Sequence, residues 1–414
     1  MTTEILHRPD PILKWNLRQL YWDVLWFGIL AGSTLAFQAV YAARLGASGF
    51  QIGLISAGPA VVNLLLTLPS GSWMEGKSLI KVTYRSSIWQ RLGYLFLVAM
   101  PWLFPSPEGQ IWGLIWTTLV MSIAGTVLAI SFNAMFAEVL PPEWRAHAVG
   151  RRNILLAITI TVATLVSGQI LDGVIFPYNY QIVFLIGAAG AMLSSYHLGR
   201  VRKQASAEFS SNVEEAASAE ENSTEKRRSW LRVDLLSGSF GVFMVSYLVF
   251  YAFQFFPVPL FPIAYIDLAH MTDGMIGLGT AIFYGAMMLA SLRLSYFSTR
   301  FGHRKVLMIS AALFPIFPLF LGMAKGPELY YLACLIGGGI NAMLTGAMIN
   351  RLMERVPSKD RPAHMAWHNL ALNLGILIGS FLGPASANLI GLQPSLFLGA
   401  GLRLLAAGFF WLWG

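Results

Sequence analysis

The stretch EVLPPEWRAHAVGRRN, from Glu138 to Asn153, has a partial copy, ERVPSKDRPAHMAWHN, from Glu354 to Asn369. Four residues recur at one offset of 216 positions: Glu138 with Glu354, Pro141 with Pro357, Arg145 with Arg361 and Asn153 with Asn369. Both copies are charged, although 56% of the chain is apolar. Four identities in sixteen positions become meaningful only if the two copies occupy equivalent places in the fold.

The sequence around the two copies has the composition of a membrane protein. Only 12% of its 414 residues are charged and the mean hydropathy is +0.61, whereas soluble proteins carry about 25% charged residues. Runs long enough to cross ~30 Å of hydrocarbon, roughly 20 residues each, recur along the chain. Twelve such runs are centred near Leu30, Val61, Leu95, Val120, Thr161, Ala188, Val249, Met287, Ala312, Gly338, Ile376 and Leu404. Barrel strands would alternate in polarity, so the runs predict an all-α polytopic membrane protein with twelve transmembrane helices.

The basic residues are concentrated on one side of these runs. The N-terminal tail and the even-numbered loops hold 25 of the 28 Lys and Arg residues, whereas Arg44 and Lys325 lie on the other side. Cytoplasmic loops carry an excess of Lys and Arg, so we expect both termini in the cytoplasm and the protein in the plasma (inner) membrane. The net charge of +8 therefore reflects orientation, and we expect no nucleic-acid partner.

The ends and the cysteine content add two expectations. Residues 1–19 contain no apolar segment before a cleavage site, so the first run should remain as a membrane anchor. Cys334 is the single cysteine, which excludes an intrachain disulfide.

The two copies follow the fourth and the tenth run, which are equivalent places if each half of the chain has six runs. A second match, IGL at 52–54 and at 276–278, opens the second run of each half. The pattern predicts an internal duplication into two pseudo-symmetric six-helix bundles, 1–199 and 236–414, joined by a cytoplasmic linker, 200–235. Ser, Ala and Glu dominate that linker, which indicates a flexible segment; a short surface helix is the alternative.

The loop between the eighth and ninth runs reads SYFSTRFGHRKVL, from Ser295 to Leu307. In this loop, and in its weaker first-half copy GSWMEGKSLIKVTYR, the chain resembles the major facilitator superfamily of secondary transporters, and the likeness extends over its whole length. The residues that fit the family's loop signature are Arg300, Phe301, Gly302, Arg304 and Lys305, with Gly71 and Glu75 in the first copy. Thr299 stands at the acidic position of the second copy and His303 replaces one Arg. A Gly-Pro antiporter signature is missing from the fifth run.

The resemblance implies that Glu75 and Glu138 form a salt-bridge clasp against the other half, with Arg85 or Arg91 as the basic partner. The clasp is expected to be closed when the pocket faces outward and broken when it faces inward. The expected gating residues are Gly71, Glu75, Arg85, Glu138, Arg145, Arg300, Gly302, Arg304, Glu354 and Arg361. The alternative is that these charges only anchor the loops at the lipid headgroups.

The resemblance also implies that the first and fourth helix of each six line a central cavity at the bilayer midplane. The candidate substrate contacts are the polar and aromatic residues spaced helically along these runs: Trp26, Thr34, Gln38, Tyr41, Thr126, Asn133, Tyr247, Tyr251, Gln254, Asn341 and Thr345. Such a lining favours a neutral, amphipathic or weakly charged solute. The alternative is that the polar residues form hydrogen bonds between helices.

Two ionisable residues lie within or near the expected hydrocarbon. Asp23 is a candidate for proton coupling, because desolvation favours the neutral carboxyl and so allows a proton to bind. The alternative is an interfacial residue at a helix start, stabilised by the helix dipole. Arg403, near the middle of the last run, is expected to turn toward backbone carbonyls or Asn373 rather than toward substrate.

Other chemistries are not indicated by the sequence. His364 and His368 lie four residues apart without a carboxylate or Cys in a zinc-helix pattern, so we expect no metal. A phosphate-binding Gly-rich loop is lacking, so we expect no nucleotide and no other cofactor. The runs hold no cluster of His or acidic residues typical of an integral-membrane enzyme.

These features together predict a monomeric secondary active transporter that moves a small solute across the membrane by alternating access. We expect a proton or solute gradient to drive it, with H+ as the coupling ion, and the lipid bilayer as its surroundings. Import and export stay open, so a proton-coupled antiporter that exports drugs or metabolites is an alternative. A receptor or scaffold with the same fold that does not transport is a second alternative, although a breakable clasp would have no use there.

Overall fold

The computed structural model describes residues 10–74, 76–203, 236, 239–356 and 361–413. Within these ranges every regular element is a helix. The first half forms α1 (Pro11–Leu30), η1 (Ala31–Leu35), α2 (Ala36–Arg44), α3 (Gly49–Met74), α4 (Leu79–Leu103), α5 (Pro107–Val139), α6 (Pro142–Gly173) and α7 (Tyr178–Leu198). The second half forms α9 (Ser239–Phe255), η4 (Val258–Leu260), α10 (Phe261–Asp267), α11 (Asp273–Ser291), α12 (Leu294–Phe301), α13 (His303–Leu313), α14 (Ile316–Met323), α15 (Pro327–Arg355), α16 (Arg361–Ile390) and α17 (Leu392–Trp413).

The prediction of twelve transmembrane helices is confirmed. Eleven segments of the described chain are long and apolar enough to cross a membrane. The twelfth is α4, which has 25 residues and carries Lys81, Arg85 and Arg91. Each of the twelve predicted centres lies in one of these segments.

Three spans are interrupted. The first span contains a π-helical turn, η1, between α1 and α2. The seventh span breaks between α9 and η4, at Pro257, and the ninth breaks between α13 and α14, at Pro315. Proline cannot donate its backbone nitrogen to the helical ladder, which explains the second and third breaks.

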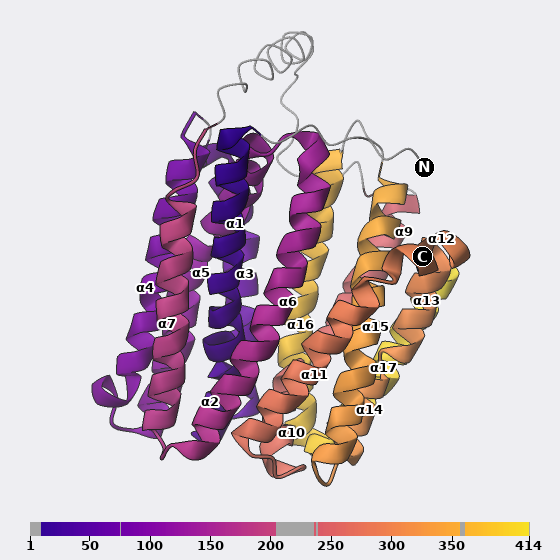
Figure 1. Ribbon diagram of the computed structural model, residues 1–414. Coiled ribbons are helices and arrows are strands. Elements are labelled where there is room, and N and C mark those ends of the chain that lie inside the picture. The colour runs from indigo at the N-terminus through magenta and orange to yellow at the C-terminus, as the bar shows by residue number, and fades with distance from the viewer. Residues whose placement is uncertain (1–9, 75, 204–235, 237–238, 357–360, 414) are drawn as a thin grey trace.

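The helices form two groups that stand side by side (Figure 1). We name helices α1–α7 the N group and helices α9–α17 the C group. We name the end of the molecule where α1 begins and α17 ends the terminal end, and the opposite end, where α2 finishes, the Arg44 end. The predicted bundle boundaries stay a prediction, because residues 204–235 of the linker lie outside the described residues.

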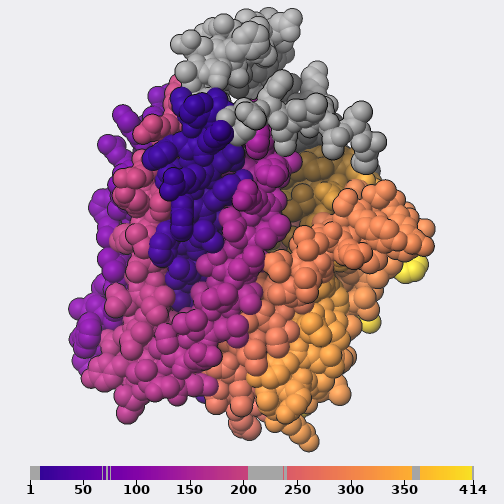
Figure 2. Space-filling model, viewed as in Figure 1, coloured from indigo at the N-terminus to yellow at the C-terminus, as the bar shows by residue number. Residues whose placement is uncertain are grey.

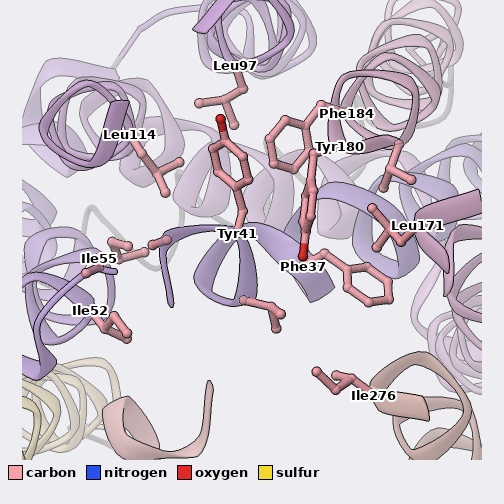
Figure 3. Packing of buried hydrophobic residues seen from close by; sticks show 14 of the residues in the cluster. Phe37, Tyr41, Ile52, Ile55, Leu97, Leu114, Leu171, Tyr180, Phe184 and Ile276 are labelled. Atoms are coloured by element: carbon pink, nitrogen blue, oxygen red, sulfur yellow. The ribbon is translucent and has the colours of Figure 1, made fainter. Parts of the chain in front are cut away.

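Buried apolar side chains pack the two groups together at the Arg44 end but not along their whole length. One cluster of buried apolar side chains there contains residues of both groups, among them Phe37 of α2 and Ile276 of α11 (Figure 3). Toward the terminal end, a separate cluster around Leu20 belongs to the N group, and another around Phe410 belongs to the C group. Figure 2 shows a hollow between α6 and α12 at that end, with α16 behind it. The groups are therefore closed against each other at the Arg44 end and parted toward the terminal end.

Candidate functional site

An ion pair joins the two groups at the closed end. Arg44 is the last residue of α2, and its Nη2 lies 3.0 Å from Oδ1 of Asp273, the first residue of α11. The same nitrogen donates a 2.6 Å hydrogen bond to the backbone oxygen of Met271. Thr272 caps α11 by accepting from the Met275 amide, so the Asp273 carboxylate lies in the first turn, where the helix dipole stabilises an anion.

Two further contacts complete this network. Tyr180 of α7 donates its hydroxyl to Oδ2 of Asp273 at 2.9 Å. Asp172 of α6 accepts from the Thr272 hydroxyl at 2.8 Å and from the Gly274 amide at 2.9 Å. Each group thus contributes a carboxylate that is held by donors of the other group. We name Arg44, Asp172, Tyr180, Thr272 and Asp273 the Arg44 gate.

Glycines let the helix backbones of the two groups touch beside this gate. A methyl group at Gly277 of α11 would lie 2.9 Å from the Thr164 carbonyl oxygen of α6. A methyl group at Gly53 of α3 would overlap the Ser380 carbonyl oxygen of α16. Helix association in lipid depends on close van der Waals packing, which small residues permit. The closed end therefore has two glycine seams, α6 against α11 and α3 against α16.

A chain of polar side chains crosses between the groups at mid-depth. The Thr126 hydroxyl of α5 donates to the side-chain oxygen Oδ1 of Asn63 at 2.5 Å. Asn63 of α3 in turn donates to Asn373 of α16 at 3.4 Å, and Asn373 donates to the Asn369 backbone oxygen at 2.8 Å. Thr126 was a predicted substrate contact, whereas Asn63 was not, because nothing local marks one Asn of an apolar run as facing another helix.

Asp23 lies in a charge cluster buried inside the N group. Its carboxylate is 3.3 Å from Arg152 of α6 and 3.8 Å from Arg91 of α4, and it accepts a 2.5 Å hydrogen bond from Ser194 of α7. Arg91 also donates to the Ser195 hydroxyl at 2.8 Å. One carboxylate thus faces two guanidinium groups, which leaves an excess of positive charge.

This position corrects one interpretation of Asp23. It is not an interfacial helix-start residue, because α1 begins at Pro11 and its capping residue is Asp10. Arg91 contacts Asp23 and Ser195 inside the N group, so its side chain does not reach the C group as the expected clasp would require. A buried ion pair costs desolvation of both partners, which several hydrogen bonds offset here.

The predicted substrate contacts of the first span do not all face the C group. Thr34 is buried against Gly187 of α7, and Tyr41 donates its hydroxyl to Gln110 of α5. Trp26 and Gln38 are half-buried. The π-helical turn at 31–35 adds a residue and rotates the residues beyond it about the helix axis, so the regular helical spacing assumed for these contacts is not kept along the span.

Some of the substrate contacts predicted in the C group and in α5 are buried against other protein groups, and others are exposed. Tyr247 is buried and donates to the Met348 backbone oxygen at 3.0 Å, while the Tyr251 hydroxyl pairs with His368 at 2.9 Å. The Gln254 backbone oxygen accepts from Arg403 at 2.5 Å, so the expectation that Arg403 turns to a carbonyl is confirmed. Asn341 is half-buried, whereas Asn133 and Thr345 are exposed. Substrate contact by these residues stays a prediction.

The hydrogen bonds described for the expected gating residues of the terminal end all lie within their own helix group. Arg145 donates to the backbone oxygens of Leu140 and Ala137 at the end of α5. Arg300 donates to the Tyr296 hydroxyl, Arg304 to the Trp411 backbone oxygen, and Arg351 to Glu354. Gly302 joins α12 to α13 with φ of 81°, a conformation that favours glycine.

The expected salt-bridge clasp includes residues that lie outside the described part of the chain. Glu75 lies outside the described residues, as does the side chain of Arg361, which begins α16. Gly71 belongs to the last turn of α3, Glu138 is half-buried, and Arg85 is exposed on α4. The clasp stays a prediction.

The sequence alone did not predict the Arg44 gate. One signal was present: Arg44 is one of two cations on that side of the membrane, and Asp172 and Asp273 lie in loops of the same side. Arg44 and Asp273 are 229 residues apart in the chain, however, so their pairing can be recognised only when the tertiary structure is known.

The comparisons with known proteins agree with this geometry. The sequence profile of the Major Facilitator Superfamily matches residues 24–258 and 243–414. A 150-residue stretch is 22% identical to Multidrug resistance protein 2 of Bacillus subtilis (strain 168), and the match covers 36% of this chain and 37% of that protein. A mutant of the nucleoside transporter NupG has a TM-score of 0.74 at 15% identity, over 96% of this chain and 99% of that one. The D-xylose-proton symporter has a TM-score of 0.73 at 15% identity, over 97% of each chain.

Proposed function

The chain belongs to the Major Facilitator Superfamily and is an integral membrane transporter, and from this premise we propose that it moves a small, neutral or weakly charged solute by gradient-driven alternating access. Its solved relatives are transporters rather than enzymes. A single chain contains both helix groups and the gate between them, which supports action as a monomer.

The observation that carries the proposal is the difference between the two ends of the molecule. Apolar packing, an ion pair and two glycine seams join the groups at the Arg44 end, while toward the terminal end each group has its own core. This is the geometry of one state of a two-state cycle, since a site between the groups would be reached from the terminal end. Rocking of one group against the other would reverse the access.

We assign the terminal end to the cytoplasm, because 25 of the 28 Lys and Arg residues lie in the tail and the even-numbered loops. The state described would then be open inward. In that state the clasp expected around Glu138 should be broken.

The mid-depth chain of Thr126, Asn63 and Asn373 is the strongest candidate for solute contact, because it bridges both groups. Its amide and hydroxyl groups are neutral and offer both donors and acceptors, which suits a hydroxylated neutral solute. A nucleoside and D-xylose are therefore the first solutes to test in proteoliposomes, with and without a pH gradient. Failure of every neutral solute to enter would contradict the proposal.

Export of drugs is the second candidate function, favoured by the stretch that resembles Multidrug resistance protein 2. It predicts that a lipophilic cationic dye is expelled when the pH gradient is imposed, while D-xylose is not moved. The same vesicles, loaded with dye or with sugar, decide between the two.

Proton coupling is proposed for Asp23, and it predicts different effects on two kinds of flux. Asp23→Asn cannot bind or release a proton, so gradient-driven accumulation should be lost while solute exchange across the membrane persists. Both fluxes are measured in the same proteoliposomes with the transported solute. Unchanged accumulation would remove Asp23 from the mechanism.

A purely structural role for Asp23 has another signature. Without the carboxylate, Arg91 and Arg152 would remain buried and unneutralised, a cost of about 3–5 kcal/mol for breaking a buried pair. Accumulation, exchange and thermal stability would then fall together. The conservative variant Asp23→Glu keeps an ionisable group and should retain accumulation.

A further inference from the structure

A groove runs along the outer face of the N group, between α4 and α5. Helix α4 stands at the edge of the N group that lies farthest from the C group (Figure 1), so this groove is separate from the passage between the groups. Toward the terminal end it widens into a cavity of about 670 Å³. Its lining includes Trp73, Lys77, Lys81, Arg85, Trp89 and Ala124.

This cavity is built to attract an anion. Lys77, Lys81 and Arg85 contribute three cations, and the described lining contains no acidic side chain. The cavity also includes Ser78, the capping residue of α4, whose side chain makes no capping hydrogen bond. The first amides of α4 are therefore available to an oxygen ligand, and the helix dipole adds to the attraction.

The groove continues as an apolar channel toward the Arg44 end. The adjoining cavity has a volume of about 620 Å³ and shares Trp89 and Ala124 with the basic cavity. Its other lining residues are mostly apolar and include the aromatic side chains of Phe96, Phe104, Trp112 and Trp116. A basic mouth that leads directly into an aromatic channel matches a molecule with an anionic head and a long apolar tail.

Tryptophans mark the mouth of the groove. Trp73 is 56% and Trp89 is 71% exposed, and the Lys77 ammonium lies 3.3 Å from the centre of the Trp73 ring. Trp and Lys are typical of the headgroup level of a bilayer. The basic cavity thus lies where lipid headgroups would meet the protein.

We propose that this groove binds one anionic glycerophospholipid. Its phosphate contacts Lys77, Lys81 and Arg85 at the start of α4, and an acyl chain passes Trp89 and Ala124 into the apolar channel. A free phosphate ion would use only the basic cavity, so the channel argues for a lipid. A zwitterionic lipid carries a positive group beside its phosphate and would neutralise the three cations less fully. Clusters of Lys and Arg therefore favour anionic lipids.

Native mass spectrometry of the full-length protein tests this site. The protein is presented with equimolar dioleoyl phosphatidylglycerol and dioleoyl phosphatidylcholine, and the ratio of the two singly bound adducts is measured. The unchanged chain should retain one phosphatidylglycerol preferentially. Lys77→Gln/Lys81→Gln/Arg85→Gln should lower that ratio at least about tenfold, since each basic residue contributes on the order of 1 kcal/mol to anionic-lipid attraction.

The matched control removes the same charge from the same end of the molecule. Arg200, Arg293 and Lys305 are exposed and lie outside the groove, so Arg200→Gln/Arg293→Gln/Lys305→Gln should keep the preference. An equal loss in both triple variants would contradict a defined site and indicate bulk electrostatic attraction.

The tail contact is tested separately at the point that both cavities share. Ala124→Trp should reduce retention of dioleoyl phosphatidylglycerol but not of its dihexanoyl form, whose chains are too short to pass that point. Inorganic phosphate should not displace the long-chain lipid. Equal retention of both lipids by Ala124→Trp, or displacement by phosphate, would overturn the proposal.

Discussion

Arg44→Gln is expected to open the sealed end of the transporter. Arg44 of the N group donates to Asp273 and to the Met271 backbone of the C group, so separation of the two groups at this end would break both contacts. Charge-assisted hydrogen bonds contribute about 1.5–3 kcal/mol, so their loss should raise the ratio of open to closed molecules at the Arg44 end by roughly 10- to 150-fold. The Asp273 carboxylate, left with Tyr180, would also gain hydration in the open state.

The alkylation rate of a buried cysteine measures this opening. Ala269 is 3% exposed and belongs to the apolar cluster that joins the groups, so Ala269→Cys should react with a membrane-impermeant maleimide only when the end opens. Cys334→Ala serves as the background. Lys325→Gln removes a cation from the same end, but from outside the gate, and should leave the rate unchanged. Equal rates in Arg44→Gln and Lys325→Gln would show that the ion pair does not hold the end closed.

Gly53→Ala is expected to have the second large effect. The added methyl group would overlap the Ser380 carbonyl oxygen, and two helix backbones cannot yield as a flexible side chain does. Overpacking costs about 1–3 kcal/mol. At the Arg44 end, this cost should lower the ratio of closed to open molecules by roughly 5- to 150-fold. The Ala269→Cys alkylation rate should rise by that factor, and solute flux should fall because closure is a step of every cycle.

Gly58 provides the control within the same helix. A methyl group there meets only the Leu119 side chain, at 3.4 Å, an ordinary contact. Alanine is the better helix former by about 1 kcal/mol, so Gly58→Ala should be neutral or stabilising and should leave the alkylation rate as it was. If both substitutions raise the rate alike, the glycine seam is not what limits closure.

The helices could be predicted from the sequence because hydropathy is a local property. Even α4, with Lys81, Arg85 and Arg91, was predicted, since its apolar residues still outnumber these charges. The charge cluster of Asp23 could be predicted only in part. An acid inside a span attracts attention by itself, but its partners come from α4, α6 and α7 and are far away in sequence.

The orientation of side chains was harder to predict, for a specific physical reason. The interior placement of Thr34 and Tyr41 follows a π-helical turn at 31–35 that shifts the helical register. Such a turn is stabilised by packing against neighbouring helices and leaves no clear pattern in the sequence. The Arg44 gate likewise depends on how two groups of helices meet, which no single run of residues encodes.

The two ends of the molecule are expected to open in alternation, and paired distance measurements test this expectation. Spin labels at Glu108 and Lys325 span the Arg44 end, and labels at Glu143 and Thr299 span the terminal end; all four positions are exposed. In the Cys334→Ala background, each pair is measured by pulsed electron paramagnetic resonance with and without Arg44→Gln. Alternating access predicts that the fraction with a long Glu108–Lys325 distance rises as the fraction with a long Glu143–Thr299 distance falls by the same amount. Both distances lengthening together, or either changing alone, would contradict it.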